Sequence, residues 1–224
     1  MASWDFLVPV GMFGAFAVLS AGILAFAARA QLRVHQKLRE LAPRLPLRFT
    51  GPAADLEKVP GPERLKPLLQ AFFPWRLEGS RGGFEVAAYP ETRGSGKSKT
   101  SYTVVEAVLN RPVGFPFRAG REPALLSLGK ALFKMQDIEV GEKAFDQAVR
   151  LQGADAAAIQ SLFSDPVLQT AFLGALEKHP SVTLHDTRVR WEVQAVLTDE
   201  ETYREALDLV VDLAAILEKT AAAQ

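Results

Sequence analysis

The chain opens with a long run of hydrophobic positions. Residues 6–28, FLVPVGMFGAFAVLSAGILAFAA, contain no charged side chain. A helix rises about 1.5 Å per residue, so this run would extend roughly 34 Å, and the hydrocarbon core of a bilayer is about 30 Å thick. The pattern therefore predicts a single transmembrane helix over residues 6–28. Trp4 fits the interfacial position that tryptophan favours in membrane proteins.

A cleaved signal peptide is the alternative interpretation of this run. Ala28-Arg29-Ala30 resembles a cleavage site, and cleavage would export the rest of the chain. However, no basic residue precedes the run, and the run exceeds the about 7–15 apolar residues of a signal peptide. We therefore expect an uncleaved anchor. Small residues at spacing four within residues 11–25 also permit a homodimer through this helix.

Basic side chains follow the apolar run and set the predicted topology. Only Glu40 opposes them within residues 29–48, and the N-terminal side carries Asp5 and no basic residue. The positive-inside rule predicts an inner-membrane protein with its N-terminus outside and its domain cytoplasmic. The basic residues should also attract anionic lipid headgroups, at about 1 kcal/mol per charge near the surface. The residues expected to do so here are Arg29, Arg33, Lys37 and Arg39.

The next segment, residues 43–74, is rich in proline and glycine and lacks periodicity. Pro43 and Pro46 are expected to end a helix that continues from the membrane. We expect a tether with one short helix after Pro62. The predicted division is an anchor with a basic juxtamembrane helix over 1–42, the tether over 43–74, and a soluble folded domain over 75–224.

Within residues 75–224, alternating and β-branched segments predict strands, and a period near 3.6 predicts helices. Strands are expected at 83–89, 101–109, 115–118, 145–151, 182–184 and 188–196. Helices are expected at 123–134, 155–163, 164–178 and, from a capping box of Thr198 with Glu201, to the C-terminus. The core-facing stripe of that last helix would be Tyr203, Leu207, Val210, Ala214 and Leu217. Strands and helices do not alternate regularly, so the fold class is α+β: an antiparallel sheet with helices packed on one face.

Composition and charge change this picture in two ways. The absence of cysteine excludes disulfides, thiolate catalysis and zinc–cysteine sites. The net charge of zero hides an asymmetry: residues 29–121 hold 17 basic and 8 acidic side chains, whereas residues 122–224 hold 9 and 17. We expect the basic half to face the lipid bilayer and the acidic half to face a protein partner. Aromatic residues are not interleaved with the basic ones, so no nucleic-acid partner is expected.

One stretch is similar to a nucleotide-binding motif. RGSGKSKTSYTVV, residues 93–105, contains GSGKS. A phosphate-binding loop requires G-x-x-x-x-G-K-[ST] followed by a helix. Glu91 stands at the first glycine position, and a strand pattern follows the motif. We therefore expect a hairpin loop over residues 90–100, whose Arg93, Lys97 and Lys99 contact lipid headgroups.

No catalytic, cofactor or metal site is predicted. The acidic residues of segment 137–146 do not have the spacing of a calcium loop, which needs glycine at its sixth position and glutamate at its twelfth. The histidines, at positions 35, 179 and 185, lack partners at helical spacing, and His185 is expected in a hairpin turn. We predict a non-catalytic binding or scaffolding module. The alternative is an enzyme whose active site forms only in three dimensions.

A resemblance covers residues 137–176. Asp137 leads through Gly141 to Phe145-Asp146, and the junction Leu162-Phe163-Ser164-Asp165-Pro166 opens a helix that runs to Leu176. This order resembles a family of uncharacterised bacterial membrane-anchored proteins with an α+β domain, and the RGSGKSKTSYT hairpin is similar as well. The family has no assigned activity, so the resemblance implies architecture only. We expect Phe145 to enter the core and Asp146 to accept hydrogen bonds from turn amides.

Overall fold

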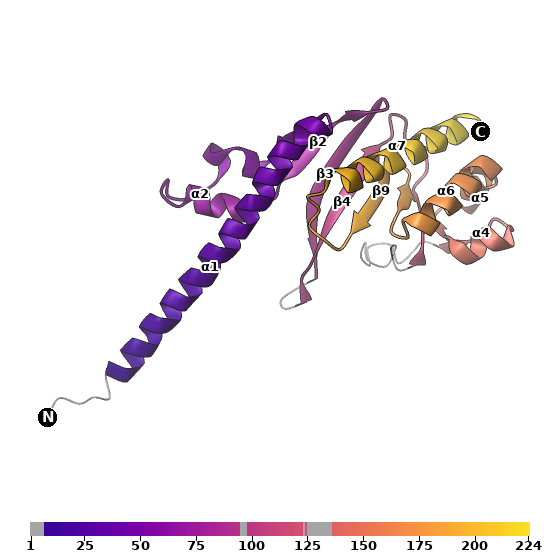
Figure 1. Ribbon diagram of the computed structural model, residues 1–224. Coiled ribbons are helices and arrows are strands. Elements are labelled where there is room, and N and C mark those ends of the chain that lie inside the picture. Colours follow the sequence, from indigo (N-terminus) through magenta and orange to yellow (C-terminus); the bar gives the residue numbers. More distant parts are fainter. Residues whose placement is uncertain (1–6, 95–97, 123, 125–135) are drawn as a thin grey trace.

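The computed structural model describes residues 7–94, 98–122, 124 and 136–224, and for residues 7–19, 136 and 137 only the backbone. Within these residues, nine strands form one antiparallel sheet in the order β1-β2-β3-β4-β9-β8-β5-β7-β6. The strands are β1 (Leu47–Thr50), β2 (Arg76–Arg81), β3 (Phe84–Arg93), β4 (Thr100–Val108), β5 (Phe117–Gly120), β6 (Gln136–Ile138), β7 (Arg150–Gly153), β8 (Thr183–His185) and β9 (Arg188–Val193). The predicted α+β class, with helices on one face of an antiparallel sheet, is confirmed (Figure 1).

The helices pack against the sheet and complete the hydrophobic core. They are α1 (Leu7–Leu41), α2 (Lys66–Leu69), α4 (Lys143–Ala148), α5 (Ala156–Phe163), α6 (Pro166–Lys178) and α7 (Glu200–Ala222). Short 3-10 turns are η2 (Ala42–Arg44), η3 (Pro52–Ala54), η4 (Leu56–Lys58) and η5 (Gln70–Phe72). Helix α7 packs across β4 and β9, and α6 packs against α7. The predicted stripe of α7 is buried in full, with Tyr203, Leu207, Val210, Ala214 and Leu217 all in the core.

Helix α1 is continuous from Leu7 to Leu41, and its C-terminal end belongs to the domain core. Leu38 and Leu41 are buried there together with Leu45. Across the part of the chain that the structure describes, no helix combines the length and apolar character needed to cross a membrane. Phe6 and the side chains of residues 7–19 lie outside that part, so the membrane-spanning segment predicted over 6–28 stays a prediction.

Residues 43–74 are more ordered than the predicted tether. Strand β1 pairs with β2 from Leu47↔Gly79 to Thr50↔Arg76, and neither strand was predicted from the sequence. The predicted short helix is present as α2. Proline and glycine occur here because the chain turns repeatedly through η3, η4 and η5, and of this segment α2 and η5 pack against α1.

Segment 137–153 differs from its predicted strand over 145–151. Residues Lys143–Ala148 form helix α4, and β7 begins only at Arg150. The expected roles of Phe145 and Asp146 are nevertheless confirmed. Phe145 is fully buried, and the two carboxylate oxygens of Asp146 accept hydrogen bonds from the amides of Val140 and Gly141, each at 2.9 Å.

Helices α6 and α7 both begin after an aspartate N-cap, and the cap of α7 lies one residue later than predicted. The Asp165 carboxylate accepts from the amides of Val167 and Leu168 and so caps α6 at the predicted position. Helix α7 is capped by Asp199, which accepts from the Thr202 amide at 2.8 Å, one residue later than the predicted Thr198 box. A carboxylate at the N-cap satisfies a free amide and opposes the helix dipole. The helix predicted over 123–134 lies outside the described residues, apart from Ala124.

Candidate functional site

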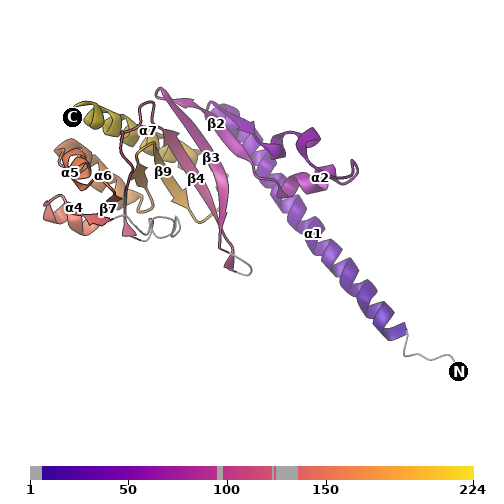
Figure 2. The same ribbon diagram turned by 180° about the vertical axis from the view of Figure 1, so that it is seen from behind.

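Charged side chains line the sheet face opposite the helices. Side chains alternate between the two faces of a strand, so residues 85, 87, 89, 91 and 93 of β3 share one face. The register places residues 102, 104 and 106 of β4 and residues 188, 190 and 192 of β9 on the same face. In Figure 2, which shows the molecule from behind, β3 and β4 lie in front of α7. We call this surface the polar face.

Four of these side chains form a closed ionic ring that bridges β3 and β9. Arg93 donates to both carboxylate oxygens of Glu192, at 2.8 and 2.5 Å, and its Nε donates to Glu91 at 2.7 Å. Arg190 donates through Nη2 to Glu91 at 2.6 Å and to Glu192 at 3.2 Å. Val104, on the intervening strand β4, is fully buried. The ring therefore arches over β4 and joins strands about 10 Å apart.

The hydrogen bonds of the ring favour the charged forms of Arg93 and Glu91. The hydrogen bonds that Arg93 donates to Glu192 are the main cause that raises the pKa of Arg93 above its ordinary value. Burial alone would raise the pKa of Glu91, but hydrogen bonds from Arg93 and Arg190 outweigh it and lower that pKa. Charge-assisted bidentate pairs of this kind are short and geometrically specific. The ring therefore locks the orientation of the hairpin base relative to β9.

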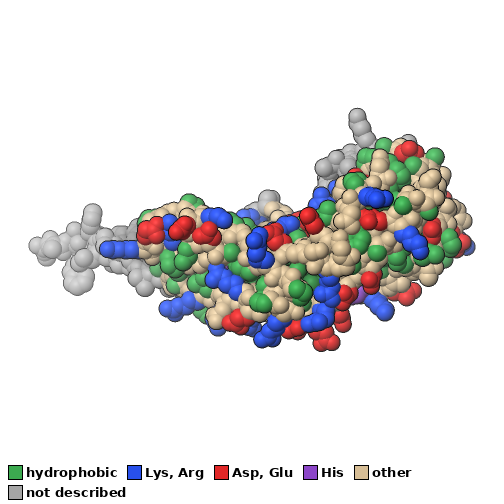
Figure 3. Space-filling model, turned by 90° about the horizontal axis from the view of Figure 1, so that it is seen from above, with side chains coloured by type: hydrophobic (Ala, Val, Ile, Leu, Met, Phe, Trp, Pro, Cys, Tyr) green, Lys and Arg blue, Asp and Glu red, His purple; other side chains and the backbone are tan. Residues whose placement is uncertain are grey.

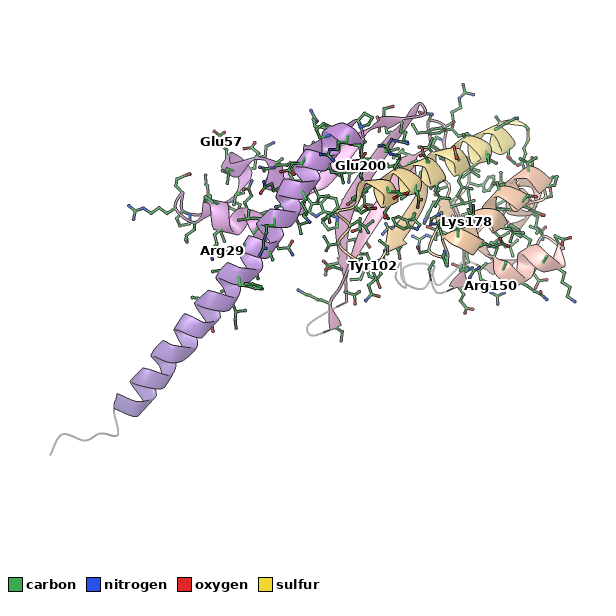
Figure 4. All side chains as sticks on the ribbon, viewed as in Figure 1. Arg29, Glu57, Tyr102, Arg150, Lys178 and Glu200 are labelled. Carbon is green, nitrogen blue, oxygen red and sulfur yellow. The ribbon has the colours of Figure 1, made fainter. Side chains whose placement is uncertain are left out.

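A second cluster lies beside the ring, around Glu106. Tyr89 donates a hydrogen bond to this carboxylate at 2.9 Å, and Arg188 donates at 3.4 Å. Burial, with the neighbouring Glu106 charge, raises the pKa of Tyr89 to about 12. Two arginines also stack on tyrosines: Arg76 lies 4.9 Å from the Tyr89 ring, and Arg93 lies 4.6 Å from the ring of Tyr102. Figure 4 places Tyr102 near the base of the hairpin.

His185 ends β8 within the polar face and not in the predicted turn. It pairs in register with Arg118 of β5, and its Nε2 lies 3.1 Å from the Thr183 hydroxyl. Burial, together with the charges of Arg118, Arg188 and Arg190, lowers the pKa of His185 to about 3. The imidazole is therefore neutral at physiological pH and serves as a hydrogen-bonding core group.

The pKa of His185 predicts a pH dependence of stability. The unfolded chain takes up a proton near pH 6.5 while the folded chain does not until about pH 3, so stability falls as pH drops below 6.5. Glu91 affects the pH dependence of stability only at lower pH. Its lowered pKa in the folded chain contributes stability that is complete above the ordinary pKa of 4.5 and is lost as the pH falls through the folded pKa. We expect His185→Gln to flatten the loss of stability between about pH 7 and pH 5. Urea unfolding at both pH values measures this, and an unchanged slope would contradict the assignment.

The residues predicted to contact lipid lie in two different parts of the chain, on α1 and in the β3–β4 hairpin. Arg29, Arg33 and Lys37 are exposed on α1. Arg39 is exposed as well, with Nη2 donating to the Ala53 carbonyl and the guanidinium 5.2 Å from the Phe49 ring. Lys99 is exposed, Lys97 lies outside the described residues, and Arg93 belongs to the ionic ring. Lipid contact by these seven residues stays a prediction.

The GSGKS stretch has the surroundings expected of a hairpin. Strand β3 runs to Arg93 and pairs with β4, whose first residue is Thr100, so a strand and no helix follows the motif. Ser95, Gly96 and Lys97 lie outside the described residues. Glu91, which occupies the first glycine position of the motif, has a structural role because it bonds two arginines of the ring.

Arg190 and Glu192 were not among the residues predicted to form a site. The signal was present, because Arg188-Val-Arg-Trp-Glu-Val alternates charged and apolar residues at the period of a strand. Among the described residues, no three carboxylate or imidazole groups converge in a way that could hold a metal ion. The guanidinium and carboxylate groups of the ring bind one another, and Glu106, Arg190 and Glu192 are buried, so the ring acts within the sheet.

Comparisons with known proteins add a likeness of fold. No known protein-family profile matches the sequence, and no curated protein matches it. Among solved structures, the crystal structure of the mycobacterial trehalose monomycolate transport factor A, TtfA, is similar, with a TM-score of 0.51 and 10% sequence identity. The match covers 84% of this chain and 95% of that chain. At this identity the likeness concerns the fold alone.

Proposed function

We propose that this protein is a single-pass inner-membrane protein whose α+β domain is a non-catalytic binding or scaffolding module in the cytoplasm. Residues 6–28 form the anchor, with the N-terminus outside. The uncharged run, long enough to cross a bilayer, and the basic flank at residues 29–48 support this placement. The observation that carries the proposal is the continuity of α1, which runs without a break from Leu7 into the domain core.

This continuity suits a scaffold. A flexible linker would let the domain sample many positions relative to the membrane. Here the buried side chains of Leu38, Leu41 and Leu45 fix the end of α1 against the sheet. Arg44 adds an ion pair of 3.5 Å to Glu200 at the start of α7. The domain would therefore be held at a fixed height and orientation above the bilayer, which lowers the entropic cost of binding a membrane-bound partner.

The topology can be tested with single cysteines, because the chain has none of its own. We expect a cysteine at Ser3 to react with a membrane-impermeant thiol reagent in intact cells. A cysteine at Val167, which is exposed on α6, should react only after lysis. Reaction of both in intact cells would mean export of the domain, and recovery of the chain in the soluble fraction would contradict the anchor.

We place the partner surface on the acidic half, in the groove between α6 and α7. This groove has a volume of about 530 Å³. Its lining combines apolar side chains such as Ile216 with the acidic residues Glu205, Asp208 and Asp212 and with Lys178. Asp208 is already paired with Arg81 at 2.6 Å, which leaves Glu205 and Asp212 as the acidic residues for a partner. Figure 3 shows basic and acidic side chains interspersed over the face seen from above. A basic segment of a partner is the chemistry that fits this groove.

Charge reversal tests the groove. We expect Glu205→Lys with Asp212→Lys to reduce recovery of a cross-linked partner from native membranes by about tenfold or more, since like charges would then face each other. Glu139→Lys with Glu142→Lys, two exposed acidic residues outside the groove, makes the same change in net charge and should leave recovery unchanged. Equal loss in both variants would contradict the groove as the partner surface.

The name of the structural neighbour supports one refinement. That protein is described as a transport factor for trehalose monomycolate. We extend the proposal to a partner that belongs to a membrane transport system, on the support of this likeness of fold. The cross-linked species from native membranes, identified by mass spectrometry, tests the refinement. A partner that recurs with the wild type, is lost with the groove variant and has no transport role would contradict it.

A further inference from the structure

Among the described residues, seven of the ten exposed large hydrophobic side chains belong to α1 and to the segment of residues 52–73 that packs beside it. The large hydrophobic residues with the greatest exposure among the described residues include Ile23, Leu24 and Phe26 on α1. Four more belong to the segment of residues 52–73, which we call the α2 lobe: Leu56, Leu65, Leu68 and Phe72. Leu65 is 49% exposed and Phe72 is 52% exposed. Exposed apolar residues grouped in this way mark a contact surface.

The α2 lobe lies beside the part of α1 where the predicted membrane segment ends. Both α2 and η5 contact α1. Ala28, the last residue of the predicted membrane segment, is fully buried, whereas Phe26 and Arg29 are exposed. Figure 4 places Arg29 on α1 next to the lobe. The exposed leucines and phenylalanine of the lobe are thus close to the level at which α1 would leave the bilayer.

The lobe presents these side chains from a fixed backbone. Arg39 and Gln70 both donate hydrogen bonds to the Ala53 carbonyl, at 2.6 and 2.7 Å. Val59 and Ala71 are buried beneath the surface of the lobe. Because the inner side of the lobe is packed, its exposed apolar side chains cannot turn inward to leave water. The packing of the lobe therefore keeps these side chains exposed.

The lobe itself carries no net charge, because Asp55, Glu57 and Glu63 balance its three basic side chains, and the basic excess at this end comes from the adjoining helix α1. Lys58, Arg64 and Lys66 are interspersed with the exposed apolar residues, and Arg29 and Arg33 lie on the adjoining helix. Lys66 is paired with Glu63 at 2.5 Å, and Lys58 with Asp55 at 3.5 Å, which leaves Arg64 with the clearest access to headgroups. Apolar side chains flanked by basic ones are the composition of segments that lie in the membrane interface.

We propose that the α2 lobe is a second membrane contact, which inserts Leu65, Leu68 and Phe72 into the headgroup–acyl boundary of the cytoplasmic leaflet. The inference rests on the anchor and orientation of the proposed function. Two contacts on one rigid body fix the tilt and the rotation of the domain, whereas a single helix leaves its rotation free. The lobe therefore determines which side of the domain faces a partner in the same membrane.

Site-specific fluorescence in vesicles tests the lobe. The full-length chain, with single cysteines Leu68→Cys or Phe72→Cys carrying an environment-sensitive nitrobenzoxadiazole label, is reconstituted into vesicles of phosphatidylcholine and phosphatidylglycerol. We expect lipids with a spin label near the headgroup to quench both labels at least about twofold more than a label at Val167→Cys. Val167 is a matched control because it is an exposed aliphatic residue on α6, far from the lobe.

A label at Ile23→Cys separates failure of this inference from failure of the anchor. If Ile23 is quenched by lipid and the lobe labels behave like Val167, the anchor stands and the lobe proposal is overturned. If Ile23 is not quenched either, the anchor itself fails. Lobe labels that are shielded only in native membranes, and not in vesicles, would mean that a protein covers the lobe and would also overturn the proposal. Circular dichroism of each labelled chain confirms its fold.

Discussion

Replacing Glu192 by alanine is expected to lower the free energy of unfolding by about 3–5 kcal/mol. The side chain of Glu192 is only 7% exposed, and it accepts hydrogen bonds from two guanidinium groups, of Arg93 and Arg190. The alanine variant leaves both cations largely buried with Glu91 as the remaining carboxylate of the ring. An unpaired buried charge is costly because it has lost its water and has gained no partner. Urea unfolding of the detergent-solubilised chain measures the effect.

An exposed carboxylate provides the matched control. Glu78 also contacts two arginines, Arg48 at 3.4 Å and Arg76 at 3.2 Å, but its side chain is 38% exposed. Solvent screening reduces such pairs to about 0–1 kcal/mol, so Glu78→Ala should have a small effect. If Glu192→Ala lowered the free energy of unfolding no more than Glu78→Ala, burial would not explain how much the ring stabilises the fold.

A double variant separates charge imbalance from lost packing. Arg93→Met removes one cation and keeps an apolar chain of similar length, and Glu192→Ala with Arg93→Met leaves one arginine facing one glutamate. We expect this pair to cost clearly less than the sum of the two single changes, because the neutrality of the ring is restored. Additive losses would show instead that each side chain acts through its own packing.

The second large effect is expected in the aromatic part of the core. Phe163, at the end of α5, is fully buried and meets Phe117 of β5 edge to face at 5.5 Å and Phe145 of α4 at 5.9 Å. It thus joins two helices to the sheet. Phe163→Ala removes these contacts and leaves a cavity that the rigid sheet cannot close, at a cost of about 3–5 kcal/mol. Thermal and urea unfolding measure the loss.

Phe72→Ser is the control for this prediction. Phe72 is exposed on η5, so its replacement should change stability by less than about 1 kcal/mol. A loss for Phe72→Ser similar to that for Phe163→Ala would show that the lobe side chain is part of the core after all. The same outcome would weaken its assignment to a lipid contact.

The elements that the sequence predicted best are those with a strong period and a local stop signal. The α7 stripe from Tyr203 to Leu217 keeps the helical spacing over four turns, and Asp165 with Pro166 marks the start of α6. Both were predictable because the signal lies within a few residues. Strands β1 and β2 were missed because four to six residues among prolines and glycines carry little periodicity. They are strands because β1 pairs with β2 and β2 pairs with β3.

By itself, the sequence determined the α+β class, the β3–β4 hairpin around GSGKS, and the core role of Phe145. Hydrophobic period and turn chemistry are local properties, so they can be interpreted without coordinates. Only the tertiary structure decided which charges meet. Glu91 and Glu192 lie 101 positions apart in the sequence, and both bind Arg93 because β9 enters the sheet directly beside β4. Likewise, only the packing of the α2 lobe against α1 placed exposed apolar side chains beside the predicted end of the membrane segment, because strand order and helix contacts depend on the whole chain.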